Sequence, residues 1–185
     1  MSLVDHFLAP LTFLAALGCG LVSGIFFAFS NFVMKALAQV PGEQGMRAMQ
    51  AINVTVLNPL FLTLFLGTGA ICVFLGIASI VRWQGAGSLG LLVGSALYLF
   101  GNIAVTGACN VPRNDALARI NSTAPEAAEA WRKYKVEWTR WNHVRTITAL
   151  AAAAAFTIVF CQFRGVSTAA FPSAGNSSAN YADRQ

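Results

Sequence analysis

Residues 59–82 read PLFLTLFLGTGAICVFLGIASIVR, and the only charged side chain in this stretch is the arginine at its end. Because an α-helix rises about 1.5 Å per residue, a stretch of this length crosses the roughly 30 Å hydrocarbon core of a bilayer. A helix also satisfies every backbone polar group internally, so the stretch predicts a transmembrane α-helix. Three further apolar runs accompany it, at residues 8–37, 87–109 and 141–163.

The composition of the whole chain agrees with a membrane protein. Of the 185 residues, 56% are hydrophobic and only 10% are charged, whereas soluble proteins carry about 25% charged residues. Short links join the four runs and leave no room for a second core. The sequence therefore predicts an all-α, up-down four-helix transmembrane bundle over residues 1–164, and a disordered tail over residues 165–185.

Two of the links are expected to carry short helices of their own. In the first link, methionine and isoleucine recur at helical spacing over residues 43–56, which predicts a short interfacial helix. In the third link, Pro112 is expected to end the preceding helix. Ser122 or Thr123 is expected to cap the next helix, which can run into the fourth span without a break.

Lysine and arginine are divided unevenly between the two predicted sides of the membrane. The opposite side from the first and third links holds only Arg82, Arg164 and Arg184. The first and third links and the adjoining helix ends hold Lys35, Arg47, Arg113, Arg119, Arg132, Lys133, Lys135, Arg140 and Arg145. The positive-inside rule then predicts cytoplasmic links and both termini outside. The net charge of +5 is interpreted as a topology signal, with no nucleic-acid partner.

Polar side chains, which are costly inside a bilayer, gather at the predicted cytoplasmic end of all four helices. The candidate substrate-binding residues are Asn31, Lys35, Asn102, Thr106, Asn110, Asn114, Trp138, Trp141 and Asn142. His143 is the candidate catalytic base, and Arg145 is the candidate group, together with Asn110 and Asn142, that stabilises an anion. Phe26, Phe27, Phe29 and Phe32 are expected to wall an apolar cavity above this cluster. Such a site suits a hydrophobic small-molecule substrate.

The same residues also allow a purely structural interpretation. Asparagine and serine join helices in membranes, lysine and arginine extend toward the headgroups, and tryptophan marks the interface. A non-catalytic membrane module that binds lipid or a small molecule, or assists a partner protein, is therefore the alternative to an enzyme. The two histidines, His6 and His143, lie at opposite ends of the bundle, so no metal and no other cofactor is predicted. Gly90, Gly94 and Gly101 would permit close helix contacts in a homo-oligomer.

Four segments are similar to a known family. They are GIFFAFSNFVM at residues 24–34, AMQAIN at 48–53, NVPRNDAL at 110–117 and WTRWNHVRT at 138–146. Together they resemble the anthrone oxygenase-like family of small bacterial and fungal membrane proteins. The resemblance implies oxidation of an anthrone to an anthraquinone by dioxygen without metal or flavin, and a location in the bacterial inner membrane. It transfers no catalytic residues, so the roles given above rest on position and chemistry.

Overall fold

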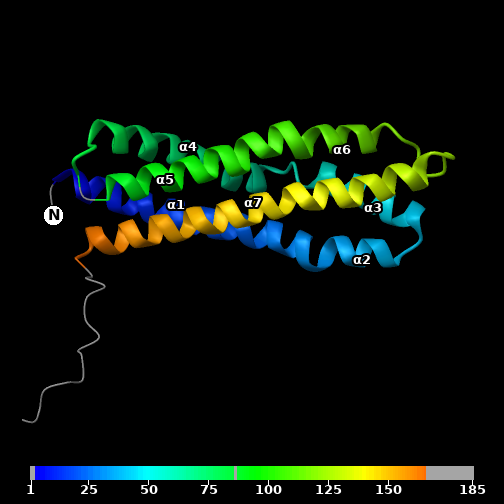
Figure 1. Ribbon diagram of the computed structural model, residues 1–185, viewed down its shortest axis with the longest axis horizontal. Coiled ribbons are helices and arrows are strands. Elements are labelled where there is room, and N and C mark those ends of the chain that lie inside the picture. Colours follow the sequence, from blue (N-terminus) through cyan, green and yellow to red (C-terminus); the bar gives the residue numbers. More distant parts are fainter. Residues whose placement is uncertain (1–2, 86, 166–185) are drawn as a thin grey trace, which may run out of the picture.

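Four long helical segments run side by side in the computed structural model, which describes residues 3–85 and 87–165 (Figure 1). The segments are α1 (Leu3–Ala28) with η1 (Phe29–Val33) and α2 (Met34–Gln39); α4 (Pro59–Val81); α5 (Ser88–Tyr98) with η2 (Leu99–Ala104), η3 (Thr106–Asn110) and α6 (Val111–Ala118); and α7 (Ala127–Phe163). A shorter helix, α3 (Gly42–Thr55), joins the first segment to the second. The described residues contain no strand, and the predicted all-helical bundle is confirmed. Residues 166–185, which hold nearly all of the predicted tail, lie outside the described part of the chain.

All four segments are long and apolar enough to cross a membrane. Large hydrophobic side chains such as Leu60, Phe100 and Leu150 are exposed on the outside of the bundle. In water so many exposed apolar groups would be unfavourable, and in a bilayer they face lipid tails. The chain is therefore an integral membrane protein in contact with lipid.

The bundle contains two hydrophobic cores, which follow one another along its long axis. The larger core joins the four long segments around fully buried residues such as Cys19, Leu75 and Phe156. The smaller core lies at the end that carries α3, where Met46 and Met49 pack against α6 and the first half of α7. The predicted interfacial helix is thus present, but protein rather than lipid covers its apolar face.

The third helical segment continues through Pro112 to Ala118, past the point where a helix end was predicted. A proline lacks a backbone N–H and its ring crowds the carbonyl of the preceding turn. Here the turn before Pro112 is the π-helical η3, whose hydrogen bonds join residues five apart and so shift that carbonyl. On the same turn, the Arg113 guanidinium donates to the Cys109 carbonyl oxygen at 2.5 Å.

The fourth segment starts later than predicted and then runs without a break. The helix begins at Ala127, so the prediction of Ser122 or Thr123 as its N-cap is wrong. The cause is local, because Asn121 Oδ1 accepts hydrogen bonds from both the backbone N–H (3.1 Å) and the hydroxyl (3.0 Å) of Thr123. These bonds stabilise a turn in place of a first helical turn. At 37 residues, α7 is about 55 Å long, which is enough to cross the bilayer and extend beyond it.

Close contact between the third and fourth segments gives a testable prediction. A Cβ added at Gly101 would lie 2.4 Å from Thr148 Cβ, whereas one at Gly107 would meet nothing within 4 Å. We expect Gly101→Ala to destabilise the protein by about 1–3 kcal/mol, the usual cost of overpacking. The thermal unfolding midpoint in detergent measures this effect. Gly107→Ala is the matched control with an unchanged midpoint, and equal midpoints for both variants would refute the close contact.

Candidate functional site

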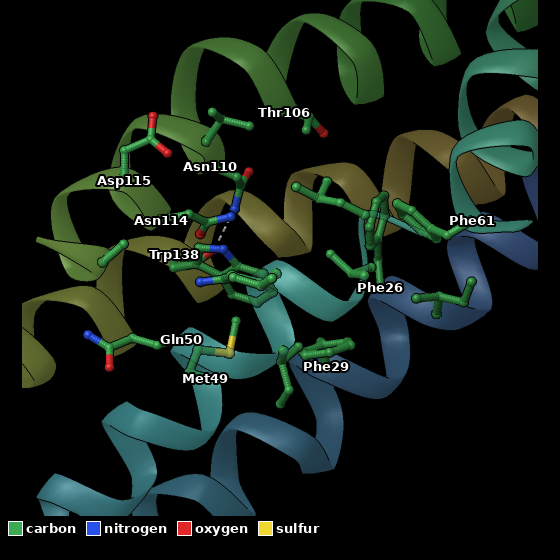
Figure 2. Close-up of a pocket in the computed structure, with 18 of the residues that line it drawn as sticks. Phe26, Phe29, Met49, Gln50, Phe61, Thr106, Asn110, Asn114, Asp115 and Trp138 are labelled. Atoms are coloured by element: carbon green, nitrogen blue, oxygen red, sulfur yellow. Dashed lines mark hydrogen bonds between the residues drawn. The ribbon is translucent and has the colours of Figure 1, made fainter. Parts of the chain in front are cut away.

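A cavity of about 270 Å³ lies inside the bundle at the end that carries α3 (Figure 2). Its walls come from all four long segments and from α3. The lining residues are Ile25, Phe26, Phe29, Met49, Gln50, Ile52, Asn53, Val54, Val56, Leu57, Phe61, Phe65, Thr106, Asn110, Val111, Asn114, Asp115, Ala118, Trp138 and Arg145. The volume lies just below the roughly 300–1,000 Å³ that is usual for ligand pockets, so the cavity suits an organic molecule at the small end of that range.

Aromatic rings form one side of the cavity. The rings of Phe61 and Phe65 on α4 stack with centroids 5.7 Å apart, and Phe26 on α1 meets Phe65 edge-on at 6.2 Å. On the other flank, Phe29 packs against Trp138 at 5.7 Å. Figure 2 shows Phe26, Phe29 and Trp138 around the same space. Flat apolar walls of this kind suit an aromatic ligand.

The third helical segment supplies a row of polar groups to the opposite side. Thr106, Asn110 and Asn114 follow one another along it, and the carboxylate of Asp115 lies at the exposed rim. Asn110 is buried, and its Nδ2 donates to the Trp138 carbonyl oxygen at 3.3 Å, while its Oδ1 has no partner among the described residues. Thr106, Asn110 and Asn114, three of the predicted substrate-binding residues, therefore line the cavity.

Asn114, the last of these three residues, is held by a short chain of hydrogen bonds. Its Oδ1 accepts from the Tyr134 hydroxyl at 2.9 Å, and the Tyr134 oxygen accepts from Asn53 Nδ2 at 3.3 Å. The chain connects α3, α6 and α7. It fixes the floor of the cavity through side chains from three elements.

Arg145 on α7 brings a positive charge to the wall of the cavity although its side chain is only 4% exposed. Its Nη1 donates to Thr106 Oγ1 at 3.2 Å and its Nη2 donates to Asn142 Oδ1 at 2.6 Å. The guanidinium carbon lies 4.0 Å from the centroid of the Phe26 ring. No carboxylate pairs with Arg145 in the described part of the chain, and its Nε has no partner there. A buried charge without a counterion is costly, so such residues usually serve a function.

Asn142 fixes the position of Arg145. It is fully buried, and its Nδ2 donates to the Phe26 carbonyl oxygen at 2.6 Å and to Ser30 Oγ at 2.7 Å. These bonds join α7 to the first helical segment just where η1 begins. Because the Asn142 oxygen accepts from Arg145, the guanidinium is held against the aromatic wall.

Asn102 supports the same turn of α7 from the third segment. In the amide orientation that satisfies its neighbours, Nδ2 donates to the Arg145 carbonyl oxygen at 3.2 Å, and Oδ1 accepts from the Thr148 hydroxyl at 3.1 Å. Asn102 is fully buried and does not line the cavity. Asn102, one of the predicted substrate-binding residues, therefore positions the backbone of Arg145 and does not face the cavity.

A family model described as anthrone oxygenase matches residues 61–155, which is more than half of the chain. The chain belongs to the anthrone oxygenase family. The matched residues include the polar row and Arg145, whereas the cavity residues of α1 and α3 precede them. No curated protein and no solved structure matches the chain.

Not every predicted site residue of this anthrone oxygenase family member reaches the cavity. Asn31, Lys35 and His143 are exposed, and Trp141 is half-buried outside the lining. His143 precedes Arg145 by two residues, which at 100° per residue turns it about 200° around α7, away from the cavity. Of the four phenylalanines expected to wall the cavity, only two line it. Phe27 and Phe32 are exposed.

Other cavity residues were missing from the predicted site. Asp115, Phe61 and Phe65 line the cavity but are not among the candidate site residues named from the sequence. Gln50 also belongs here, since its Nε2 donates to the carbonyl oxygens of Leu117 (2.9 Å) and Ile120 (3.0 Å) and fastens α3 onto the end of α6. In the sequence, the signal for Gln50 was the polar face of the helix predicted in the first link. A helix lying on the membrane surface would show the same pattern.

Proposed function

We propose that the protein is a cofactor-independent oxygenase, a monooxygenase type of oxidoreductase, which converts a hydrophobic anthrone-like or phenolic substrate to a quinone. The observation that carries the proposal is the guanidinium of Arg145, buried without a carboxylate partner on the wall of an aromatic cavity. An anion formed on an aromatic ligand would find its counterion there. Membership in the anthrone oxygenase family supports this chemistry.

The hydrogen-bonding groups left without partners fit a phenolic ketone. Arg145 Nε and Trp138 Nε1 are donors, and Asn110 Oδ1 is an acceptor. A ketone oxygen accepts from the two donors, and a neighbouring phenol hydroxyl donates to Asn110. The substrate would satisfy groups that are costly to bury alone.

Asp115 is the best-placed base, since it is the one carboxylate among the described residues that line the cavity. We propose that it removes a proton from the ring methylene of an anthrone and passes it to water at the exposed rim. The electron pair of the broken C–H bond moves into the ring system and places negative charge on the ketone oxygen. Arg145 then stabilises this enolate.

Dioxygen is the oxidant in the next step. The carbanionic carbon of the enolate gives electrons to dioxygen and forms a C–O bond, and a proton completes a hydroperoxide. Loss of the second C–H proton with cleavage of the O–O bond gives the new carbonyl group and water. One dioxygen is thus reduced per quinone formed, one oxygen atom entering the product and one leaving as water. The apolar walls exclude competing water from the enolate.

The test is oxygen uptake by the purified, detergent-solubilised protein supplied with a dihydroxyanthrone, after subtraction of spontaneous autoxidation. We expect acceleration with equal amounts of dioxygen consumed and quinone formed. His143→Gln is expected to leave the rate unchanged, because this exposed side chain lies outside the cavity. Failure to accelerate any of a panel of anthrones and phenols would support a non-catalytic membrane module. A metal or flavin bound stoichiometrically in active protein would overturn the cofactor-independent mechanism.

A further inference from the structure

Besides the cavity, a groove of about 500 Å³ lies on the outer surface between the first helical segment and α7. It is lined by Ser30, Met34, Lys35, Ala38, Lys135, Val136, Thr139, Arg140 and His143. None of these residues lines the oxygenase cavity. The groove therefore needs an explanation of its own, and we call it the basic groove.

Charge distinguishes the basic groove from the rest of this end of the bundle. Lys35, Lys135, Arg140 and His143 line it, and no aspartate or glutamate does. Four other basic residues at this end of the bundle do have carboxylate partners: Arg47 pairs with Glu43, Arg113 with Glu137, Arg132 with Glu129, and Lys133 with Glu137. Among the described residues no such pair involves Lys35, Lys135 or Arg140. Lys135 instead has its ammonium 5.3 Å from the centroid of the Trp131 ring.

The groove lies where the bilayer surface is predicted. The first predicted span ends two residues after Lys35, and the fourth begins immediately after Arg140. Met34 and Val136 add apolar surface beside the cations. On α7, Val136, Arg140 and His143 stand at i, i+4 and i+7 and so share one face. Cations beside apolar surface at this depth match a phosphate headgroup followed by acyl chains.

We propose that the basic groove binds the phosphate headgroup of an anionic membrane phospholipid such as phosphatidylglycerol. Lys35, Lys135 and Arg140 contact the phosphate and the negative charge, and Met34 and Val136 contact the upper acyl chain. The proposal is independent of the oxygenase reaction. It also gives Lys35 and His143, which do not reach the cavity, a place in a different site.

The experiment titrates short-chain phosphatidylglycerol into the full-length protein in detergent and follows binding by native mass spectrometry. The test variant is Lys35→Gln/Lys135→Gln/Arg140→Gln. We expect its affinity to fall by roughly a hundredfold, since each basic group near an anionic surface contributes about fivefold. The matched control is Arg47→Gln/Arg119→Gln/Arg132→Gln, which removes the same charge outside the groove and should bind like the wild type.

Several outcomes would overturn the proposal. Equal losses in test and control variants would show attraction to overall charge, without a site. Equal binding of phosphatidylcholine with the same chains would remove the selectivity for an anionic lipid. Competition by inorganic phosphate as strong as that by the lipid would identify a free-anion site instead. The double variant Lys35→Gln/Arg140→Gln changes only exposed side chains, and it should lose affinity with an unchanged unfolding midpoint.

Discussion

Replacing Arg145 with glutamine is expected to lower kcat for anthrone oxidation by about 10²–10³, the usual loss when one preorganised group that stabilises an oxyanion is removed. The guanidinium is the only cation among the described cavity residues, and two of its nitrogens are held by Thr106 and Asn142. The guanidinium therefore does not have to move when negative charge develops on the substrate. Initial rates of oxygen uptake at saturating substrate measure the effect.

The same substitution separates a catalytic role from a structural one. Arg145 has no carboxylate partner among the described residues, so its removal leaves no buried anion unpaired. We therefore expect an unfolding midpoint close to that of the wild type. Arg145→Lys keeps the charge and should retain more activity than Arg145→Gln. Wild-type kcat in folded Arg145→Gln would contradict the proposed role.

The bilayer explains why the fold could be predicted from sequence. A span must be helical, long and apolar, and residues 59–82 meet these conditions without any knowledge of their neighbours. Within a span, the side that faces the interior depends on the packing of the other helices. Asn142 and Arg145, two members of the predicted site, are buried, whereas His143, the predicted catalytic base, is exposed. Helical periodicity separates His143 from Arg145 by about 200° around the helix, but only the packing of the other helices shows which of these two sides faces the cavity.

Local features that depend on contacts with residues distant in the sequence could not be predicted either. Nothing in the sequence indicates the π-helical turns η1, η2 and η3, of which η1 and η3 contribute residues to the cavity lining. Such turns are often found at functional sites. The burial of Met49 could not be foreseen either, because a helix with one apolar face can rest on lipid or on protein. In this chain Gln50 donates hydrogen bonds to carbonyl groups at the end of α6, so α3 packs on protein.

The two sides of α7 differ in how their charges are compensated. The inner side carries Arg145, held by neutral groups against the cavity, and the outer side carries Arg140 in the basic groove. Lipid binding on the outer side would restrain the helix that positions the guanidinium on the inner side. The two sites are nevertheless separable, because the variants expected to impair one site change no residue that lines the other.

Replacing Asp115 with asparagine is expected to lower kcat by about 10²–10⁴, the usual contribution of a positioned general base. Asparagine has nearly the same shape and cannot accept the methylene proton. The side chain is exposed at the cavity rim, so the fold should be unaffected. Oxygen uptake measures the loss, and a substrate deuterated at the reactive methylene should show a larger primary isotope effect in the variant, because proton removal becomes rate-limiting.

The pH dependence distinguishes the loss of a base from other kinds of damage. As pH rises, hydroxide can remove the proton in place of Asp115, so the difference between Asp115→Asn and the wild type should shrink. Arg145→Gln should stay slow over the same range, because hydroxide cannot stabilise the enolate. Glu126→Gln removes an exposed carboxylate outside the cavity and should match the wild type throughout. A gap that stays constant with pH would show that Asp115 is not the base, and would leave the anion-stabilising role of Arg145 standing.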